Sequence, residues 1–254
     1  MNIAIQTRPW GPEANRQTLP AILAEIAGCD YAGFEIGAQH LDTARPNILR
    51  SQAAAAGLQV VGIHIGGEIY DPANVQAMLQ NLDRLFDYIA AVGAPFVPFS
   101  GRMKTDKTAA ELQQQADALN RIGRLCAARG LRLAYHNHFW EIENDCAELH
   151  HLCDHTDPAL VGLCLDVGWV QRAGGTPADV TRTFLDRIAY FHIKDTTPAE
   201  WREVGHGDLD FPTLFAAIPR RDDLWLVVEQ DETRRPPVES AQMSRDVLQR
   251  LLGL

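Results

Sequence analysis

The sequence predicts a single (β/α)8 barrel that takes up the whole chain, residues 1–254. Short apolar segments, typical of strands buried on both faces, alternate with longer amphipathic segments that are typical of helices. The alternation repeats eight times, with mostly short connections and without a linker or a change of composition. An open doubly wound sheet is the alternative, but no glycine-rich fingerprint follows the first strand to support it.

The eight predicted strands are apolar runs, and several of them end in polar residues. In chain order they cover residues 2–6, 32–37, 58–66, 95–101, 131–138, 160–166, 188–195 and 224–230. Pro95 and Pro98 in the fourth run are awkward in the middle of a hydrogen-bonded ladder, so the ends of this strand are the least defined.

The predicted helices lie between these strands. They cover about 13–27, an alanine-rich segment that ends at Gly57, 71–92, a segment from 106 or 108 to 129, a histidine-rich segment after the fifth strand, about 176–186, 211–218 and 238–251. Asp71 and Pro72 have the N-cap and first-turn chemistry of a helix start. Gly57 and Gly130 follow helix ends, where glycine is favoured.

Composition excludes several classes of protein. A chain with 46% hydrophobic and 22% charged residues is globular, and its net charge of −10 is a poor match for nucleic acid or an anionic membrane surface. No apolar run approaches the length of a membrane span, and the N-terminus lacks the pattern of a secretion signal. The five cysteines are scattered, odd in number and without a CxxC pair, which indicates free thiols in a reducing compartment. We therefore expect a cytoplasmic protein.

The candidate site consists of polar residues at the carboxyl ends of the strands, which meet at one end of such a barrel. These residues are Glu35, His64, His136, His138, Asp166, His192, Lys194 and Glu229. Alternate side chains of a strand face the same way, so His136 and His138 should point together. Four of the residues, His136, Asp166, His192 and Glu229, come from consecutive strands. Two imidazoles and two carboxylates suit one Mn²⁺, Co²⁺ or Zn²⁺ ion better than Ca²⁺, and Mg²⁺ is less favoured.

Each of these residues also has a structural explanation when taken alone. Asp166 could cap a helix or pair with Lys194, and Glu229 could pair with an arginine of the loop 231–235. His151 and His155 lie four residues apart on a predicted helix, but their polar surroundings favour a solvated helix face over a second metal site.

Six motifs on successive strands and loops carry a resemblance to a known family: GIHIG, YHNHFWE, LCLDVGW, FHIKD, EVGHGDLDF and VVEQDE. Over nearly its whole length the chain resembles the sugar phosphate isomerase/epimerase superfamily. This is the xylose isomerase-like TIM barrel group, which also contains ketose 3-epimerases, inosose dehydratase and the endonuclease IV type of DNA repair enzyme. The resemblance implies one divalent ion held by residues of the last four strands, which by position are His136, Asp166, His192 and Glu229.

Three departures from the family pattern bear on the activity. Ketose epimerases carry a glutamate where this chain has His136, and a metal-bound imidazole cannot also accept a proton through the bound nitrogen. Trp169 stands where several relatives carry a histidine, which replaces a polar substrate contact with an apolar wall. The fourth strand supplies no histidine for the three-metal site of endonuclease IV, so with a net charge of −10 we expect no DNA cleavage.

The resemblance implies an enzyme of carbohydrate metabolism, a divalent-metal-dependent isomerase or epimerase of a small sugar or keto-polyol that works through an enediolate. The metal would bind a carbonyl and an adjacent hydroxyl oxygen and stabilise the enediolate. Glu229 is the expected base, and His138 is expected to serve as its catalytic partner. The residues expected to bind substrate oxygens are Glu35, His64, Glu141, Lys194 and His206.

Other outcomes remain open from the sequence. Loss of a β-substituent from the same enediolate would make the chain a dehydratase or lyase on an inosose or a 3-keto-glycoside, and a non-catalytic sugar-binding barrel would keep the metal without chemistry. No phosphate-binding glycine motif is present, so a phosphorylated substrate is not assumed. The loops 8–10 and 233–237 could close over the site. The analogy also allows a homo-oligomer.

Overall fold

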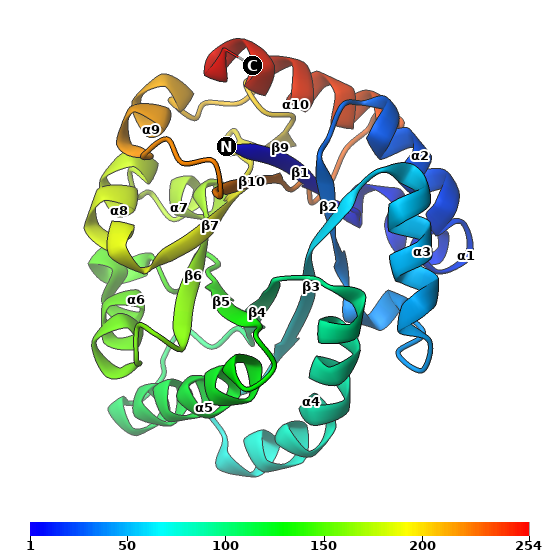
Figure 1. Ribbon diagram of the computed structural model, residues 1–254. Coiled ribbons are helices and arrows are strands. Elements are labelled where there is room, and N and C mark those ends of the chain that lie inside the picture. The colour runs from blue at the N-terminus through cyan, green and yellow to red at the C-terminus, as the bar shows by residue number, and fades with distance from the viewer. Residues whose placement is uncertain (254) are drawn as a thin grey trace.

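The computed structural model describes residues 1–253 and is a closed barrel of eight parallel strands ringed by helices (Figure 1). The barrel strands are β1 (Asn2–Gln6), β2 (Gly33–Gly37), β3 (Gln59–Gly67), β4 (Phe96–Gly101), β5 (Arg132–His136), β6 (Val161–Asp166), β7 (Ile188–Ile193) and β10 (Trp225–Val228). Neighbours along this series pair in parallel, and β10 pairs with β1 to close the ring. The predicted fold class is confirmed.

Helices cover the outside of the barrel. They are α1 (Gly11–Gln17), α2 (Leu19–Gly28), α3 (Pro46–Ala56), α4 (Pro72–Val92), α5 (Ala109–Ala127), α6 (Glu143–His155), α7 (Val167–Arg172), α8 (Pro177–Phe184), α9 (Phe211–Ala217) and α10 (Pro237–Leu252). Short 3₁₀ turns occupy η1 (Arg8–Trp10), η2 (Ala38–His40) and η3 (Leu185–Arg187). None of the helices described in residues 1–253 is long and apolar enough to cross a membrane.

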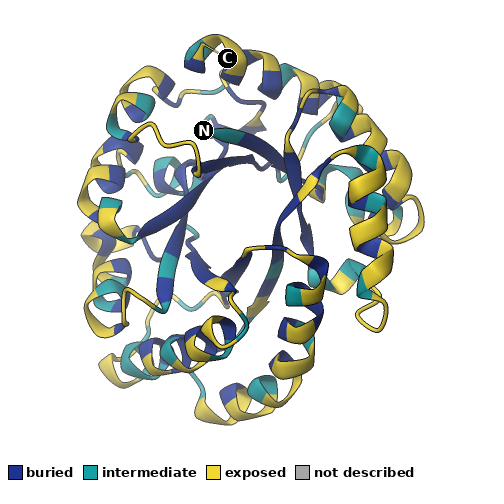
Figure 2. Cartoon of the chain, viewed as in Figure 1, coloured by how far each residue is buried: buried dark blue, intermediate teal, exposed yellow. Residues whose placement is uncertain are grey.

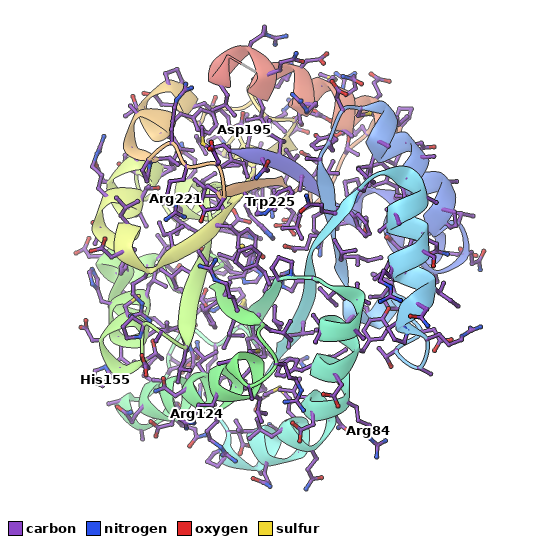
Figure 3. All side chains as sticks on the ribbon, viewed as in Figure 1. Arg84, Arg124, His155, Asp195, Arg221 and Trp225 are labelled. Atoms are coloured by element: carbon purple, nitrogen blue, oxygen red, sulfur yellow. The ribbon has the colours of Figure 1, made fainter. Side chains whose placement is uncertain are left out.

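The strands are buried on both faces, whereas the helices alternate buried and exposed positions (Figure 2). Side chains fill the middle of the ring that the ribbon leaves open (Figure 3). Inside the barrel, an apolar cluster below the candidate site includes Phe96, Cys164, Tyr190 and Trp225. A larger apolar core lies between the strands and the helices. This packing fixes the strand ends and with them the polar residues that the ends carry.

Several helix ends agree with their sequence signals. Asp71 accepts a hydrogen bond from the Ala73 N–H at the start of α4, and Thr108 and Glu111 form a reciprocal capping box at the start of α5. Gly57 ends α3 in the left-handed conformation, with φ at 69°. β4 includes Pro98, and Pro95 lies just before it.

The predicted helix over residues 13–27 is wrong in detail, because two helices occupy this segment. α1 ends at Gln17, and α2 begins at Leu19 after Thr18, whose φ of −130° and ψ of 26° are not helical. Pro20 lies in the first turn of α2, where its missing N–H costs no hydrogen bond. The proline therefore starts a second helix here and does not continue the first one.

The sixth strand ends at Asp166, as predicted, but α7, which the sequence did not predict, starts at the next residue. The Asp166 carboxylate caps this short helix by accepting a hydrogen bond from the Trp169 N–H at 2.9 Å. Six residues are too few for a clear helical period, which is why the sequence did not predict this helix.

The loop that contains EVGHGDLDF is organised by a carboxylate that the sequence did not single out. Asp195, labelled in Figure 3, begins a two-stranded hairpin of β8 (Asp195–Thr196) and β9 (Trp201–Arg202). Its side chain accepts hydrogen bonds from four backbone N–H groups, those of Thr196, Gly205, Gly207 and Leu209, at 2.8–3.2 Å. The last residue of FHIKD thereby fixes the loop that follows β9.

Candidate active site

Four side chains from neighbouring strands converge at the carboxyl end of the barrel. His136 ends β5, Asp166 ends β6, His192 lies in β7 and Glu229 follows β10 directly. The strand register pairs Asp166 with His192. All four residues are buried, and one ligand atom from each lies within 4.8 Å of the others. The structure thus brings together the four residues predicted as metal ligands.

The spacing of the donor atoms fits a metal ion. His136 Nε2 lies 3.3 Å from Asp166 Oδ2 and 3.6 Å from Glu229 Oε2, and His192 Nδ1 lies 3.1 Å from Glu229 Oε2. Donor atoms about 2.0–2.2 Å from a tetrahedral ion stand roughly 3.3–3.6 Å apart. Within the described residues His136 Nε2 and Asp166 Oδ2 are buried without a hydrogen-bond partner. Buried polar atoms are rarely left unpaired, so these two are suited to a cation.

Electrostatics in the cluster favours positive charge on the imidazoles. Burial alone would lower the pKa of His136, but the nearby carboxylates of Asp166 and Glu229 outweigh it and raise that pKa. Burial likewise opposes the charge of His192, yet Cys164, Glu35 and Glu229 raise its pKa well above the ordinary value. Burial would raise the pKa of Glu229, but Lys194 and His192 hold it well below its usual range. The carboxylates of the cluster therefore stabilise a cation placed among them.

Lys194, expected to bind a substrate oxygen, is buried beside the cluster. Its Nζ lies 2.6 Å from Asp231, 3.2 Å from Glu229 and 3.5 Å from Asp166. The indoles of Trp169 and Trp201 cover it, with ring centroids at 5.0 Å and 4.2 Å. Burial opposes its charge, but the three carboxylates raise the pKa of Lys194 above its ordinary value. Lys194 is thus engaged by protein carboxylates and does not line the pocket within the described part of the chain.

Glu35 and His64 lie next to the cluster, on β2 and β3. Glu35 is fully buried and accepts hydrogen bonds from Tyr190 at 2.8 Å, His192 at 3.1 Å and His64 at 3.2 Å. Burial would raise the pKa of Glu35, but the charge of His192 and these imidazole bonds hold it well below its usual range. Burial lowers the pKa of His64 in spite of Glu35, so this ring is neutral. Both nitrogens of His64 are engaged, by Glu35 and Ser100, which leaves none for the substrate hydroxyl expected there.

A cavity of about 320 Å³ lies in front of the cluster. Its walls include His138, Trp169, Glu229, Asp231, Arg8 and Gln39. The Arg8 guanidinium lies 2.9 Å from Asp231, so the loops after β1 and β10 meet at its rim. A second cavity, of about 470 Å³, lies where strands begin, beside Leu131 and Leu224, and does not contain the donor cluster. The cavity at the strand ends is therefore the candidate substrate pocket.

His138 faces this pocket as a neutral ring. It stacks on Trp140 with an interplanar angle of 7°, and its Nδ1 has no hydrogen-bond partner among the described residues. Burial, followed by the charge of His136, lowers the pKa of His138 to about 2. Asn137 points the other way and is paired with the backbone of Asp166 through both atoms of its amide, which fixes the end of β6 beside β5.

Glu141 and His206 are not brought to the pocket, contrary to the expectation that they bind hydroxyls. Glu141 is fully buried, where it accepts hydrogen bonds from the Tyr135 hydroxyl at 2.6 Å and the His138 backbone N–H at 2.7 Å. His206 is exposed on the loop that Asp195 organises. Neither side chain lines the cavity. Asp231 does, and its position two residues after Glu229 at a strand end was the signal that could have found it.

Replacing Glu141 with glutamine is expected to change the pH dependence of stability. Burial and then the charge of Glu148 raise the pKa of Glu141 from 4.5 to about 7. The folded chain therefore keeps a proton that the unfolded chain releases. The stability due to this group is complete below pH 4.5 and is lost as the pH rises through 7, which costs about 3 kcal/mol. Between pH 5 and pH 8 the free energy of unfolding should fall less in Glu141→Gln than in the parent chain.

Urea unfolding of both chains at pH 5 and pH 8 measures this difference. Glu143→Gln, a change at an exposed carboxylate two residues away, is the matched control and should follow the parent chain. Parallel pH profiles for the parent and Glu141→Gln would show that Glu141 carries no excess proton in the folded chain.

Comparisons with known proteins agree with this architecture. A model of the xylose isomerase-like TIM barrel family matches residues 23–251. An inosose dehydratase from Geobacillus kaustophilus is 25% identical over 272 residues, which cover 92% of this chain and 88% of the relative. Among solved structures, an L-ribulose 3-epimerase superposes with a TM-score of 0.83 at 18% identity and covers 99% of this chain and 94% of its own. The IOLI protein, which binds a zinc atom, superposes with a TM-score of 0.78 at 15% identity over 100% of this chain and 98% of its own.

Proposed function

Since the chain belongs to the xylose isomerase-like TIM barrel family, we propose that it is a divalent-metal-dependent enzyme that removes a proton next to the carbonyl of a small sugar or keto-polyol. The residues that would hold the metal are His136, Asp166, His192 and Glu229. A bound Mn²⁺, Co²⁺ or Zn²⁺ supplies Lewis-acid stabilisation of the negative charge that develops on substrate oxygens when the proton leaves. Zinc in the IOLI protein, a structural neighbour, supports a metal of this class.

The position of Glu229 is the observation that carries the proposal. Its Oε2 lies in the donor cluster, where His192 and Lys194 approach it at 3.1 Å and 3.2 Å, and the same residue lines the substrate pocket. These contacts leave Oε1 to accept the substrate proton. Because the pKa of Glu229 is held well below its usual range, the carboxylate is ionised at neutral pH, which is the form that can accept a proton.

Other residues of the pocket would orient the substrate and exclude water. Trp169 offers an apolar wall for the C–H face of a sugar ring, and Arg8 and Asp231 close the rim between two loops. His138 presents a neutral imidazole to the pocket, which can hydrogen-bond a substrate oxygen or pass its ring proton to one. Return of the proton to either carbon gives an isomer or an epimer, which is the first proposed outcome.

Elimination is the second candidate, and the donor set favours it. His136 stands where a second carboxylate base would act in a ketose epimerase, so Glu229 is the one carboxylate that both joins the cluster and lines the pocket among the described residues. Loss of a β-hydroxyl after proton removal needs only one base, because the proton that Glu229 removes can pass to the departing hydroxyl, which leaves as water. The curated relative from Geobacillus is named an inosose dehydratase, which supports a polyhydroxylated cyclic ketone as substrate.

Metal analysis combined with NMR in D₂O tests the proposal. About one equivalent of Mn, Co or Zn per chain is expected, and deuterium should enter at a carbon next to the carbonyl of a ketose, an inosose or a 3-keto-glycoside. A new diastereomer or constitutional isomer would identify the isomerase or epimerase, and a new double bond would identify the lyase. A metal-loaded chain that binds these compounds without any exchange would instead be a sugar-binding barrel.

A further inference from the structure

A chain of hydrogen bonds behind the donor cluster joins its two histidines through residues that are not ligands. Glu35 Oε2 lies 3.1 Å from His192 Nε2, and Glu35 Oε1 lies 3.2 Å from His64 Nδ1. The other nitrogen of His64, Nε2, lies 2.8 Å from Ser100 Oγ. The Ser100 hydroxyl in turn lies 3.2 Å from His136 Nδ1. The hydrogen bonds thus connect the Glu35 carboxylate directly with His192, and through His64 and Ser100 with His136.

The direction of each hydrogen bond follows from Glu35, because three donor groups, those of Tyr190, His192 and His64, surround its two oxygens, which accept from them. His192 must therefore donate from Nε2, and His64 must donate from Nδ1. A neutral imidazole that donates from one nitrogen can only accept at the other, so the Ser100 hydroxyl donates to His64 Nε2. With its own proton used, Ser100 Oγ accepts from His136 Nδ1. The donor and the acceptor of each hydrogen bond between Glu35 and the two ligand histidines are thereby assigned.

We propose that Glu35 sets the tautomer of both histidine ligands, of His192 directly and of His136 through His64 and Ser100. When both rings are neutral, as metal binding requires, the arrangement leaves the lone pairs of His192 Nδ1 and His136 Nε2 free. These are the two nitrogen atoms that face the cluster, at 3.1 Å from Glu229 Oε2 and 3.3 Å from Asp166 Oδ2 respectively. The inference rests on the proposed metal site, and it assigns Glu35, His64 and Ser100 as positioning residues.

The ligands and the positioning residues come from different sides of the barrel, which supports this assignment. The four ligands come from β5, β6, β7 and β10, whereas Glu35, His64 and Ser100 come from β2, β3 and β4. All three positioning residues lie at the same end of the barrel as the ligands, and Glu35 is fully buried. Partners of this kind orient metal-bound imidazoles, and their loss lowers metal affinity about 10- to 100-fold.

Cobalt-loaded protein and proton NMR in H₂O provide the test. The ring N–H protons of the two ligand histidines should give two signals shifted by the paramagnetic ion, and both should vanish in D₂O. In Ser100→Ala the His136 signal should shift or be lost to exchange with water while the His192 signal stays. Zinc affinity of this variant, measured by competition with a chromophoric chelator, should fall at least about 10-fold. In Glu35→Gln both signals should change.

Tyr190→Phe is the matched control, because it removes a 2.8 Å hydrogen bond to Glu35 Oε2 but leaves the bonds of Glu35 to His192 and His64 in place. It should keep both signals and hold zinc affinity within about threefold of the parent. Ser100→Ala with both signals and the affinity of the parent would overturn the inference while leaving the metal site intact, and so would Glu35→Gln with one signal unchanged. A parent chain that takes up no cobalt would overturn the metal site itself, and this inference with it.

Discussion

Glu229→Gln is expected to lower kcat by about a thousandfold, because an amide cannot accept the substrate proton that the carboxylate accepts. The side chain keeps its shape, but Oε2 also faces His192, His136 and Lys194. Metal content must therefore be measured on the same samples, and turnover compared with metal in excess. A metal-loaded variant that turns over at the parent rate would exclude Glu229 as the base.

Glu232→Gln is the matched control for this experiment. Glu232 lies three residues further along the same loop, is exposed and does not line the pocket in front of the donor cluster. It loses the same charge at nearly the same place in the chain, so its kcat should stay within about twofold of the parent. A comparable loss in both variants would point to the charge of the loop, and not to the proton acceptor, as the cause.

Removal of the metal by a chelator is expected to abolish turnover, by about a thousandfold or more, and added Mn²⁺, Co²⁺ or Zn²⁺ should restore it where Ca²⁺ does not. The same step should be coupled to protons. The pKa values of His136 and His192 are raised in the metal-free chain, so both rings hold protons at higher pH than usual. A metal binds only the neutral imidazoles, so its affinity should fall as the pH drops through these raised values.

Titration calorimetry of metal binding in two buffers with different ionisation enthalpies measures the protons released at pH 7. Release of a proton is expected at neutral pH, and a heat that does not depend on the buffer would contradict protonated histidines.

A variant with His151→Ala and His155→Ala removes the stacked pair on α6, whose ring centroids are 4.0 Å apart. It should keep both the metal and the activity, which would exclude α6 as the functional site.

The strand ends were predictable because their chemistry is local. A buried apolar run that finishes in a charged or imidazole side chain marks both the strand and its end, so His136, Asp166, His192 and Glu229 could be grouped before any coordinates. The positions of helix boundaries were less predictable. The break at Thr18 and the short helix after Asp166 each depend on one residue in a pattern that otherwise continues.

The roles of the residues around the ligands depend on partners far away in the sequence. Glu141 has the spacing of a pocket residue, but Tyr135 and the His138 backbone take both its oxygens. His64 faces the cavity, yet Glu35 and Ser100, 29 and 36 residues away, occupy its nitrogens. Ser100 gave no signal in the sequence, because one serine at a strand end is common. Glu35, His64 and Ser100 become hydrogen-bonded neighbours only through the three-dimensional arrangement of β2, β3 and β4.

The barrel closes by pairing its last strand with its first, so it cannot close until late in the synthesis of the chain. The last strand, β10, pairs with the first, from Asn2 opposite Trp225 to Ile5 opposite Val228, and Arg8 meets Asp231 above that seam. The ribosome delivers a chain from its N-terminus, so β1 emerges long before its second neighbour exists. A nascent chain without β10 lacks both the closing strand and Glu229. The proposed activity therefore requires synthesis of the chain through Glu229, and a product terminated before that residue is expected to be inert.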